Sequence, residues 1–543
     1  MPEASRPPRR RRAPVLSNLP PAIWPALQLH INQLWPLLTR DLKHAVEAAR
    51  DPKTECEGAC VPIYVSAAES PEAIAAQLER VLEPSDFARV SILPLPGAPE
   101  HIREHGLVYV PGRYVVPGGR FNELYGWDSY FIALGLLREG RTGLAQSLAD
   151  QCLYEVEHYG AVLNCNRTYC LTRSHPPFLS RLVLAVVAQS GDLDGLRRAL
   201  PAVERYHAYW QTPPHFTAAT GLSRYHALGE GPAPEAVQGE RDADGRNHYE
   251  RVCDRLRREF ADAPWLDQVY DATAHTLTAG GYRHDRTVRE SGFDLTDRFG
   301  PCGLLARDFI PVCLNTLLWC LETDIAAIRR RLGASPESIA HWESLAGERA
   351  VRMHEFFWDG EDGLFFDWNL ATGERSRYAY ATTFMPLWAG WATTEQAAEL
   401  VRRLPDFLAP GGLLTSLETT GCQWDAPFTW APMVLMAAEG LAGYGYLAEA
   451  ADLGSRFLHL AAREFERTGQ LFEKYDAVGL SADVEGKIRY GYPTNETGFG
   501  WTNAVVGELL AMLAPDGGGP PAPPPPKPRP KARKVPRRPS AKR

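Results

Sequence analysis

The segment PGGRFNELYGWDSY, at residues 117–130, gathers side chains of the kinds that recognise a sugar. Sugars present hydroxyls that hydrogen bond with charged and amide groups, and apolar ring faces that lie on aromatic rings, so a sugar site needs both kinds of group. Arg120, Glu123, Trp127 and Asp128 supply both. A structural interpretation stays open, in which Asp128 caps a helix that begins at residue 129 and Trp127 packs in the core.

Four further segments mix arginines, carboxylates and aromatic residues in the same way. They are NCNRTYCLTRSHPPF at 164–178, RESGFDLTDRFG at 289–300, QWDAPFTWAP at 423–432, and FEKYD at 472–476 followed by GYPTNETGFGWTN at 491–503. Such a mixture is costly to bury in a core, because every polar group needs a partner there. Five segments of this kind in one chain therefore indicate loops that converge on a carbohydrate site.

The elements that position these loops are predicted to be helices. Apolar residues recur with a spacing near 3.6 in ten segments: 129–158, 178–191, 194–211, 264–279, 309–332, 335–357, 394–404, 430–442, 446–466 and 499–513. Strict alternation, which is typical of strands, is rare. Long connections such as 212–262 and 280–308 are rich in Gly, Pro and Asp. The pattern predicts an all-α fold of paired helices with long functional loops on one side.

Composition and the two ends of the chain suggest a division into four parts. We expect a disordered basic tail at 1–13, a helical N-terminal cap at 14–104 with a helix near Ile23–Ala49 and further helical segments around Val61–Val90, a catalytic domain at 105–515, and a disordered tail rich in Pro, Lys and Arg at 516–543. The whole chain of 543 residues is 45% hydrophobic and 23% charged, which is the balance of a folded protein.

Charge and hydropathy exclude several classes of protein. The two tails hold 14 of the 58 Lys and Arg residues, so the body between them is acidic and offers no cationic surface for specific nucleic-acid binding. The tails themselves are expected to bind polyanions weakly. No apolar run approaches the ~18 residues that a membrane helix needs. Prolines interrupt the segment after the N-terminal arginines, which argues against an export signal and predicts a cytoplasmic protein.

Common motifs for cofactors and nucleophiles are missing. Neither GxGxxG nor GxxxxGK[ST] follows a predicted strand, and the chain has no HExxH and no GxSxG. Ten cysteines are scattered without CxxC spacing, which favours reduced thiols. Cys56 and Cys60 lack the second ligand pair that a structural zinc site requires. The missing motifs remove the simplest argument for a dinucleotide or a nucleotide triphosphate.

From residue 105 to 513 the sequence resembles the trehalase family of glycoside hydrolases. PGGRFNELYGWDSY is similar to the first signature of that family, and QWDAPFTWAP is similar to the second. The resemblance implies an (α/α)6 toroid, with six inner and six outer helices and the site at the loop-rich end. It also implies an inverting hydrolase that uses no metal and no organic cofactor and whose substrate is a small disaccharide.

The resemblance assigns a role to individual residues. The general acid corresponds to Asp294 in SGFD, the general base to Glu473 in FEKYD, and two sugar-binding arginines to Arg120 and Arg173. Inversion requires two carboxyl groups about 6.5–9.5 Å apart. Without the resemblance, a surface salt bridge with Lys474 would be the simpler interpretation of Glu473. The other expected substrate contacts are Phe121, Glu123, Trp127, Asp128, Asn166, Glu235, Gln423, Trp424, Asp425 and Trp501.

The chain departs from the family pattern around the substrate. In GPAPEAV, Ala233 stands where the family has a third arginine, while Glu235 is kept, so Arg241 or Arg246 of the same long loop is a candidate replacement. Further departures are Phe293, Phe428, Thr429 and Gly491. They leave the reaction class intact and put the substrate in question. Related hydrolases of mannosylglycerate and glucosylglycerate are the alternative to a trehalase, and an inert sugar-binding protein is the alternative from another class.

Overall fold

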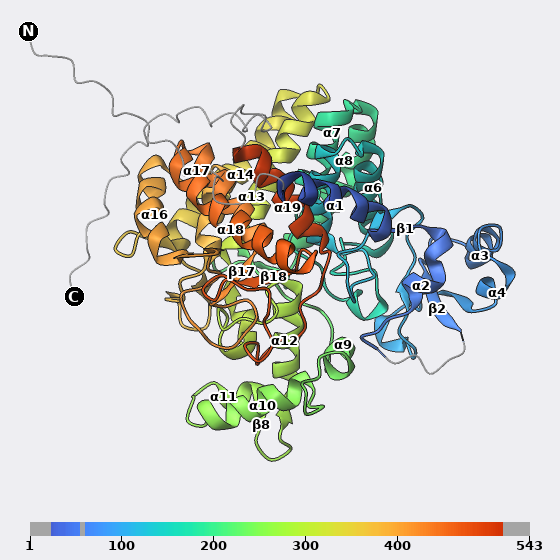
Figure 1. The fold of residues 1–543 in the computed structure, drawn as a ribbon, viewed down its shortest axis with the longest axis horizontal. Coiled ribbons are helices and arrows are strands. Elements are labelled where there is room, and N and C mark those ends of the chain that lie inside the picture. The colour runs from blue at the N-terminus through green and yellow to red at the C-terminus, as the bar shows by residue number, and fades with distance from the viewer. Residues whose placement is uncertain (1–22, 55–59, 514–543) are drawn as a thin grey trace, which may run out of the picture.

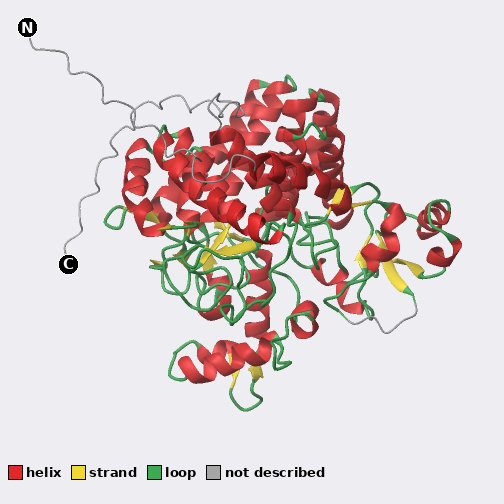
Figure 2. Ribbon diagram, viewed as in Figure 1, coloured by secondary structure: helices red, strands yellow, loops and turns green. Residues whose placement is uncertain are grey.

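The computed structural model describes residues 23–54 and 60–513 (Figure 1). The tails expected at 1–13 and 516–543 lie outside the described residues, as does Cys56. In the described part, no helix is long and apolar enough to cross a membrane. Helices dominate, as the sequence pattern predicted (Figure 2).

Six helices form a closed inner ring. They contact one another in chain order, and the last one, α19, packs against the first, α5. Most of their residues are buried whichever way they face, because each of these helices is covered by neighbours on all sides. The inner helices are α5 (Gly126–Arg138), α7 (Leu179–Ser190), α13 (Val312–Arg331), α15 (Met385–Ala389), α17 (Ala431–Gly443) and α19 (Gly500–Leu513).

A second set of six helices surrounds this ring. These helices bury one face and expose the other, which is the one-sided pattern that the sequence periodicity detected. They are α1 (Ile23–Leu38), α6 (Thr142–Tyr159), α8 (Leu193–Trp210), α14 (Pro336–Phe357), α16 (Thr394–Phe407) and α18 (Leu447–Thr468). The N-terminal helix α1 packs on α18 and α19 and completes the outer ring. The double ring confirms the expected (α/α)6 toroid.

Short and long connections alternate around the toroid. Each inner helix from α5 to α17 leads to its outer partner through two to four residues. Between α7 and α8, for example, Gly191 ends the first helix at a φ of 68°, and the Asp192 side chain caps the second by accepting from the backbone N of Gly195 at 2.8 Å. Every outer-to-inner connection has 19 residues or more. The long loops gather on one side of the helices (Figure 2).

The N-terminal region differs from the helical cap that was expected. A parallel sheet with the order β3-β2-β4 stands beside the toroid, formed by β2 (Val61–Val65), β3 (Val90–Pro94) and β4 (Leu107–Val108) (Figure 1). The helices α2 (Ala45–Ala49), α3 (Pro71–Glu79) and α4 (Pro84–Phe87) accompany it. The expected helix at 23–49 ends at Leu38, and α1 belongs to the toroid. A domain boundary at residue 104 stays a prediction.

The loop between α8 and α13 carries the remaining helices. They are α9 (Pro234–Gln238), α10 (His248–Glu259), α11 (Leu266–Val269) and α12 (Ala279–Glu290). The single helix expected at 264–279 is therefore wrong, because the strands β8 (Tyr270–Asp271) and β9 (Thr276–Leu277) form a hairpin inside that segment. Antiparallel pairing of β17 (Phe428–Trp430) with β18 (Lys474–Asp476) brings two of the predicted sugar-binding loops together.

The other strands of the described chain are two-residue pairs in the loops. They are β1 (Thr39–Arg40) with β5 (Tyr114–Val115), β6 (Phe216–Thr217) with β7 (Leu222–Ser223), β13 (Trp368–Asn369) with both β10 (Phe309–Ile310) and β14 (Glu374–Arg375), β11 (Trp358–Asp359) with β12 (Leu364–Phe365), and β15 (Leu408–Ala409) with β16 (Gly412–Leu413).

Candidate active site

A cavity of about 710 Å³, including its opening to solvent, lies among the long loops. This volume is in the range of small-molecule sites. All five segments that sequence analysis selected contribute to its wall. Ten of the predicted site residues line it: Arg120, Phe121, Trp127, Asp128, Arg173, Glu235, Asp294, Trp424, Glu473 and Trp501.

Asp294 lies in the loop that follows α12. Its side chain keeps 28% of its surface exposed, and the Gln423 amide donates to its backbone carbonyl. Burial raises the pKa of Asp294 to about 7, with Arg289 acting to lower it and Glu240 to raise it. A carboxyl group with this pKa holds a proton in a large fraction of molecules at neutral pH.

Glu473 precedes strand β18 and is almost fully buried. Lys474 lies 3.0 Å from its Oε2, and the Tyr492 hydroxyl donates to its Oε1. Burial raises the pKa of Glu473, whereas Lys474 and the Tyr492 hydrogen bond act to lower it. The salt bridge with Lys474 that sequence analysis considered therefore exists, but it lies inside the protein, since both side chains are no more than 2% exposed.

Two cavity-lining arginines hold donors that lack a protein partner. Arg173 donates from Nη2 to Glu235 at 2.5 Å, while its Nε and Nη1 and Glu235 Oε2 have no hydrogen-bond partner among the described residues. Arg120 donates from Nη1 to the Gly239 carbonyl at 3.1 Å and stacks over the Tyr492 ring, while its Nε has no hydrogen-bond partner among the described residues. Buried polar atoms are rarely left unsatisfied in proteins. Their presence in this wall indicates a ligand rich in hydroxyls.

A third arginine enters the cavity from α12. Arg289 donates to Glu240 at 2.7 Å and to Asp285 at 3.0 Å. The two replacements proposed for the missing family arginine were wrong: Arg241 and Arg246 are exposed, and neither lines the cavity. Sequence analysis had noted Arg289 in its segment without assigning it a role; its place five residues before Asp294 was the available signal.

Aromatic rings form the apolar part of the wall. Trp424 and Trp430 stack with centroids 3.8 Å apart, and Trp127 packs against Trp424 and Trp501. Trp127 is 2% exposed and lines the cavity, so it belongs both to the core and to the site. The structural alternative in which Asp128 caps the helix was wrong, because the N-cap of α5 is Tyr125.

Comparison with known proteins agrees with this geometry. The trehalase family matches residues 24–514. The chain belongs to the trehalase family. It is 35% identical to a probable trehalase of Eremothecium gossypii, over 88% of this chain and 71% of that protein. It is 34% identical to the cytosolic neutral trehalase of Saccharomyces cerevisiae, over 87% and 69% of the two chains. A solved structure of that yeast's neutral trehalase superimposes with a TM-score of 0.75 at 32% identity, covering 91% and 95%.

Two predicted contacts in the first loops of this trehalase family member do not reach the cavity. Glu123 is fully buried and pairs with Lys53 at 2.7 Å and with Arg167 at 2.8 Å. Asn166 accepts from the backbone N of Leu124 at 2.8 Å and donates to a backbone carbonyl. Both side chains are occupied in joining loops, so their placement does not support direct contact with substrate.

The same holds for two residues of the second signature. Gln423 donates to the backbone of Asp294, and Asp425 accepts from Thr296 at 2.6 Å and from the backbone N of Asp297 at 2.9 Å. Neither lines the cavity. Together they tie the second signature to the loop that carries Asp294. Their contacts therefore do not support the direct contact with substrate that was predicted.

Several lining residues were missed by sequence reasoning. Lys53 comes from the N-terminal region and Glu240 from a loop whose path the sequence did not reveal. Tyr492 stood in a selected segment, but its contact with Glu473 depends on the fold. The others are Pro117, Tyr125, Asn164, Cys165, Tyr169, His175, Arg289, Gly292, Trp430 and Phe499.

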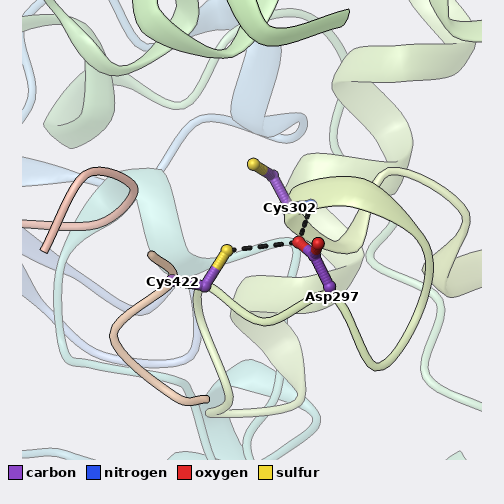
Figure 3. Close-up of side chains that lie close together, drawn as sticks. All are labelled: Asp297, Cys302 and Cys422. Carbon is purple, nitrogen blue, oxygen red and sulfur yellow. Dashed lines mark hydrogen bonds between the residues drawn. The ribbon is translucent and has the colours of Figure 1, made fainter. Parts of the chain in front are cut away.

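One group of side chains in the described chain has ligands of the kind that bind metals. Asp297, Cys302 and Cys422 each offer an atom within 4.8 Å of the others (Figure 3). Arg255 donates to both oxygens of Asp297, at 2.8 and 2.6 Å, and to the Cys302 sulfur at 3.2 Å. This guanidinium already neutralises the carboxylate and would repel a cation. The group fits an internal ion pair better than a metal site.

Proposed function

We propose that this chain is an inverting trehalase that hydrolyses trehalose to two glucose molecules, with Asp294 as the general acid and Glu473 as the general base. The observation that carries the proposal is that these two carboxyl groups line one cavity in contrasting environments. Burial raises the pKa of both carboxyl groups, to about 7 for Asp294, but only Glu473 contacts a lysine, Lys474 at 3.0 Å, that favours its ionised form. A protonated and an ionised carboxyl group are what inversion requires.

The reaction follows from these two protonation states. Asp294 donates its proton to the glycosidic oxygen, and the bond from that oxygen to the anomeric carbon breaks. On the opposite face of the sugar, Glu473 takes a proton from a water molecule, whose oxygen forms the new bond to the same carbon. One water is consumed, and the proton that Asp294 lost is equivalent to the one that Glu473 gained. Exchange with solvent restores both residues.

Sugar binding is proposed for the polar and aromatic wall. The unpartnered nitrogens of Arg173 would donate hydrogen bonds to sugar hydroxyl oxygens, and the unpartnered oxygen of Glu235 would accept hydrogen bonds from sugar hydroxyl groups. Charge-assisted bonds of this kind are strong. Arg120 and Arg289 would add donors near the carboxyl groups. The apolar faces of the sugar rings would lie against Trp127, Trp424, Trp501 and Phe121. Asp128 is the last of the predicted contacts that line the cavity. No metal or organic cofactor has a role in this proposal.

The names of the relatives favour trehalose over mannosylglycerate or glucosylglycerate, since they are a probable trehalase and a cytosolic neutral trehalase. By the same names we propose a cytoplasmic location. The reaction is proposed for the domain at 105–515, with Lys53 of the N-terminal region completing the wall. Weak polyanion binding by the tails stays a prediction, because they lie outside the described residues.

The decisive experiment offers the purified protein trehalose, mannosylglycerate and glucosylglycerate separately. Glucose release from trehalose alone is expected; the sugar released from each of the other two compounds is assayed in parallel. Hydrolysis of a glycosylglycerate without hydrolysis of trehalose would replace the proposed substrate. Sugar binding by calorimetry without any turnover would instead support the inert binding protein.

A further inference from the structure

A pair of close cysteines, one of which lines the cavity, takes no part in the proposed reaction. The sulfur atoms of Cys165 and Cys170 lie 2.7 Å apart, and both side chains are at most 1% exposed. A disulfide bond is about 2.03–2.05 Å long, so the two sulfurs need to approach by only about 0.7 Å. Cys165 is the one cysteine among the nine described that lines the cavity.

The fold holds these two cysteines together. The backbone N of Arg167 donates to the carbonyl of Cys165 at 2.7 Å, and the backbone N of Cys170 donates to that of Arg167 at 2.9 Å, which folds residues 165–170 into a compact turn. The guanidinium of Arg167 anchors the turn by donating to three carbonyls of residues 48–50. The short distance between the two sulfurs is therefore set by hydrogen bonds within the turn and by the contacts of Arg167 with residues 48–50.

Burial favours the neutral thiol of Cys165. Burial and the neighbouring Cys170 raise the pKa of Cys165 well above its usual range, while Arg173 opposes this rise. Because the thiolate is the reactive form, oxidation is expected to be slower than for an exposed thiol. The other close pair, Cys302 and Cys422, lies away from the cavity wall. A position on the cavity wall thus distinguishes Cys165 from the other described cysteines.

We propose that Cys165 and Cys170 form a modification site. Hydrogen peroxide, a molecule of about the size of water, enters through the cavity and oxidises this pair of thiols to a disulfide. One thiol attacks an oxygen of hydrogen peroxide; the O–O bond breaks, a sulfenic acid forms and one water leaves. The second thiol attacks the sulfenic sulfur, the S–S bond forms, the S–O bond breaks and a second water leaves. Two thiols and one peroxide thus give one disulfide and two waters.

Oxidation should also change the wall that binds sugar, and this consequence rests on the proposed function. Arg173 donates from Nη2 to the Cys170 sulfur at 3.4 Å as well as to Glu235. Drawing Cys170 toward Cys165 alters this contact and with it the position of the guanidinium. A rise in KM for trehalose of several-fold is therefore expected in the oxidised protein.

The test uses the full chain treated with hydrogen peroxide, blocked with N-ethylmaleimide and digested with trypsin without reductant. Trypsin cuts after Arg167, between the two cysteines, so a disulfide joins peptides 142–167 and 168–173. Fragmentation assigns the linkage, because the first peptide also contains Cys152. Linked peptides are expected only after peroxide, and they should disappear in Cys170→Ser and in Cys165→Ala. Recovery of both cysteines as blocked thiols after treatment would overturn the proposal.

Two controls make the result specific. Cys152→Ser removes another buried cysteine and should still give the linked peptides. In the wild type, peroxide should lower trehalose hydrolysis and dithiothreitol should restore it, whereas Cys170→Ser and Cys165→Ala should retain the activity they have before treatment. An equal loss in these variants would refute the site. The peptide result needs no activity, so inactivity toward trehalose would count against the proposed function alone.

Discussion

Arg289 forms a long ion pair with Asp294 but does not hydrogen bond to it. Its Nη1 lies 3.9 Å from Asp294 Oδ2, beyond hydrogen-bond distance, whereas the same nitrogen donates to Glu240 at 2.7 Å. The Nε of Arg289 donates to Asp285 at 3.0 Å. The charge of the arginine is thus committed to two other carboxylates. Burial raises the pKa of Asp294 to about 7, and Arg289, which also pairs with two other carboxylates, lowers it only in part.

The pH dependence of the reaction should follow from this pKa. The acid must be protonated to act, so kcat/KM should decrease as pH rises through about 7, the pKa of Asp294 in the free protein. On the acidic side, kcat/KM should fall where Glu473 becomes protonated, above the ordinary range for glutamate because its pKa is raised. Initial rates of trehalose hydrolysis across the pH range measure both limbs. A rate that stays constant well above neutral pH would contradict the assignment of Asp294.

Substituting Glu240 by glutamine should move the basic limb of the pH profile of kcat/KM. Its negative charge raises the pKa of Asp294, and in Glu240→Gln that charge is gone while Arg289 becomes freer to approach Asp294. Both effects lower the pKa, so the basic limb should shift to lower pH. Asp242→Asn is the matched control, because Asp242 lies in the same loop but pairs with the exposed Arg246. An unchanged limb in Glu240→Gln would mean that another group titrates.

Removing either proposed catalytic carboxyl group should abolish most turnover. Asp294→Asn and Glu473→Gln keep the shape of the side chain but remove the proton donor or the base, and each is expected to reduce kcat by about 10²–10⁴-fold or more. Asp362→Asn, at a loop position where the side chain is 43% exposed, serves as the control. Circular dichroism and thermal melts would verify folding. Near-normal turnover in a folded variant would remove that residue from its role.

The toroid was predictable because helix periodicity is a local property. The apolar spacing of residues 335–357 matches α14 closely, the segment at 164–178 falls between α6 and α7 as expected, and the segment at 423–432 leads into α17. The sheet was missed for a related reason. Its strands are at most five residues long, as in Val61–Val65, and a run that short does not distinguish a buried strand from a helix segment.

Contacts within the site were less predictable because they depend on how distant loops meet. The connection from α8 to α13 spans residues 211–311, and nothing local in it indicates that Glu240 faces inward while Arg241 faces solvent. The residue types at Glu123 and Asp425 suit a sugar, yet buried partners occupy both side chains. Residue type therefore located the segments correctly but did not separate contact residues from those that support them.

Helix α1 should contribute to the stability of the toroid, although it lies before the predicted catalytic domain. Leu27 is fully buried on this helix, whereas Leu37 is 69% exposed. Leu27→Ala is expected to lower the free energy of unfolding by about 2–5 kcal/mol, and Leu37→Ala to change it by no more than about 0.5 kcal/mol. Denaturant unfolding of the two variants compares the same substitution on one helix. Equally small changes in the free energy of unfolding for the two variants would mean that α1 does not unfold cooperatively with the toroid.

The configuration of the released sugar tests the roles of the two carboxyl groups together. If Glu473 activates water on the face opposite to the bond that Asp294 protonates, the attacked glucose leaves as the β-anomer and the other glucose as the α-anomer. Proton NMR in the first minutes, before mutarotation, should therefore show the two anomers in equal amounts. Arg173→Lys should slow the reaction without changing this ratio, since Arg173 is proposed to hold hydroxyls and to transfer no proton. Initial release of α-glucose alone would indicate retention through a covalent intermediate and would falsify the assignment of Glu473 as the base that activates water.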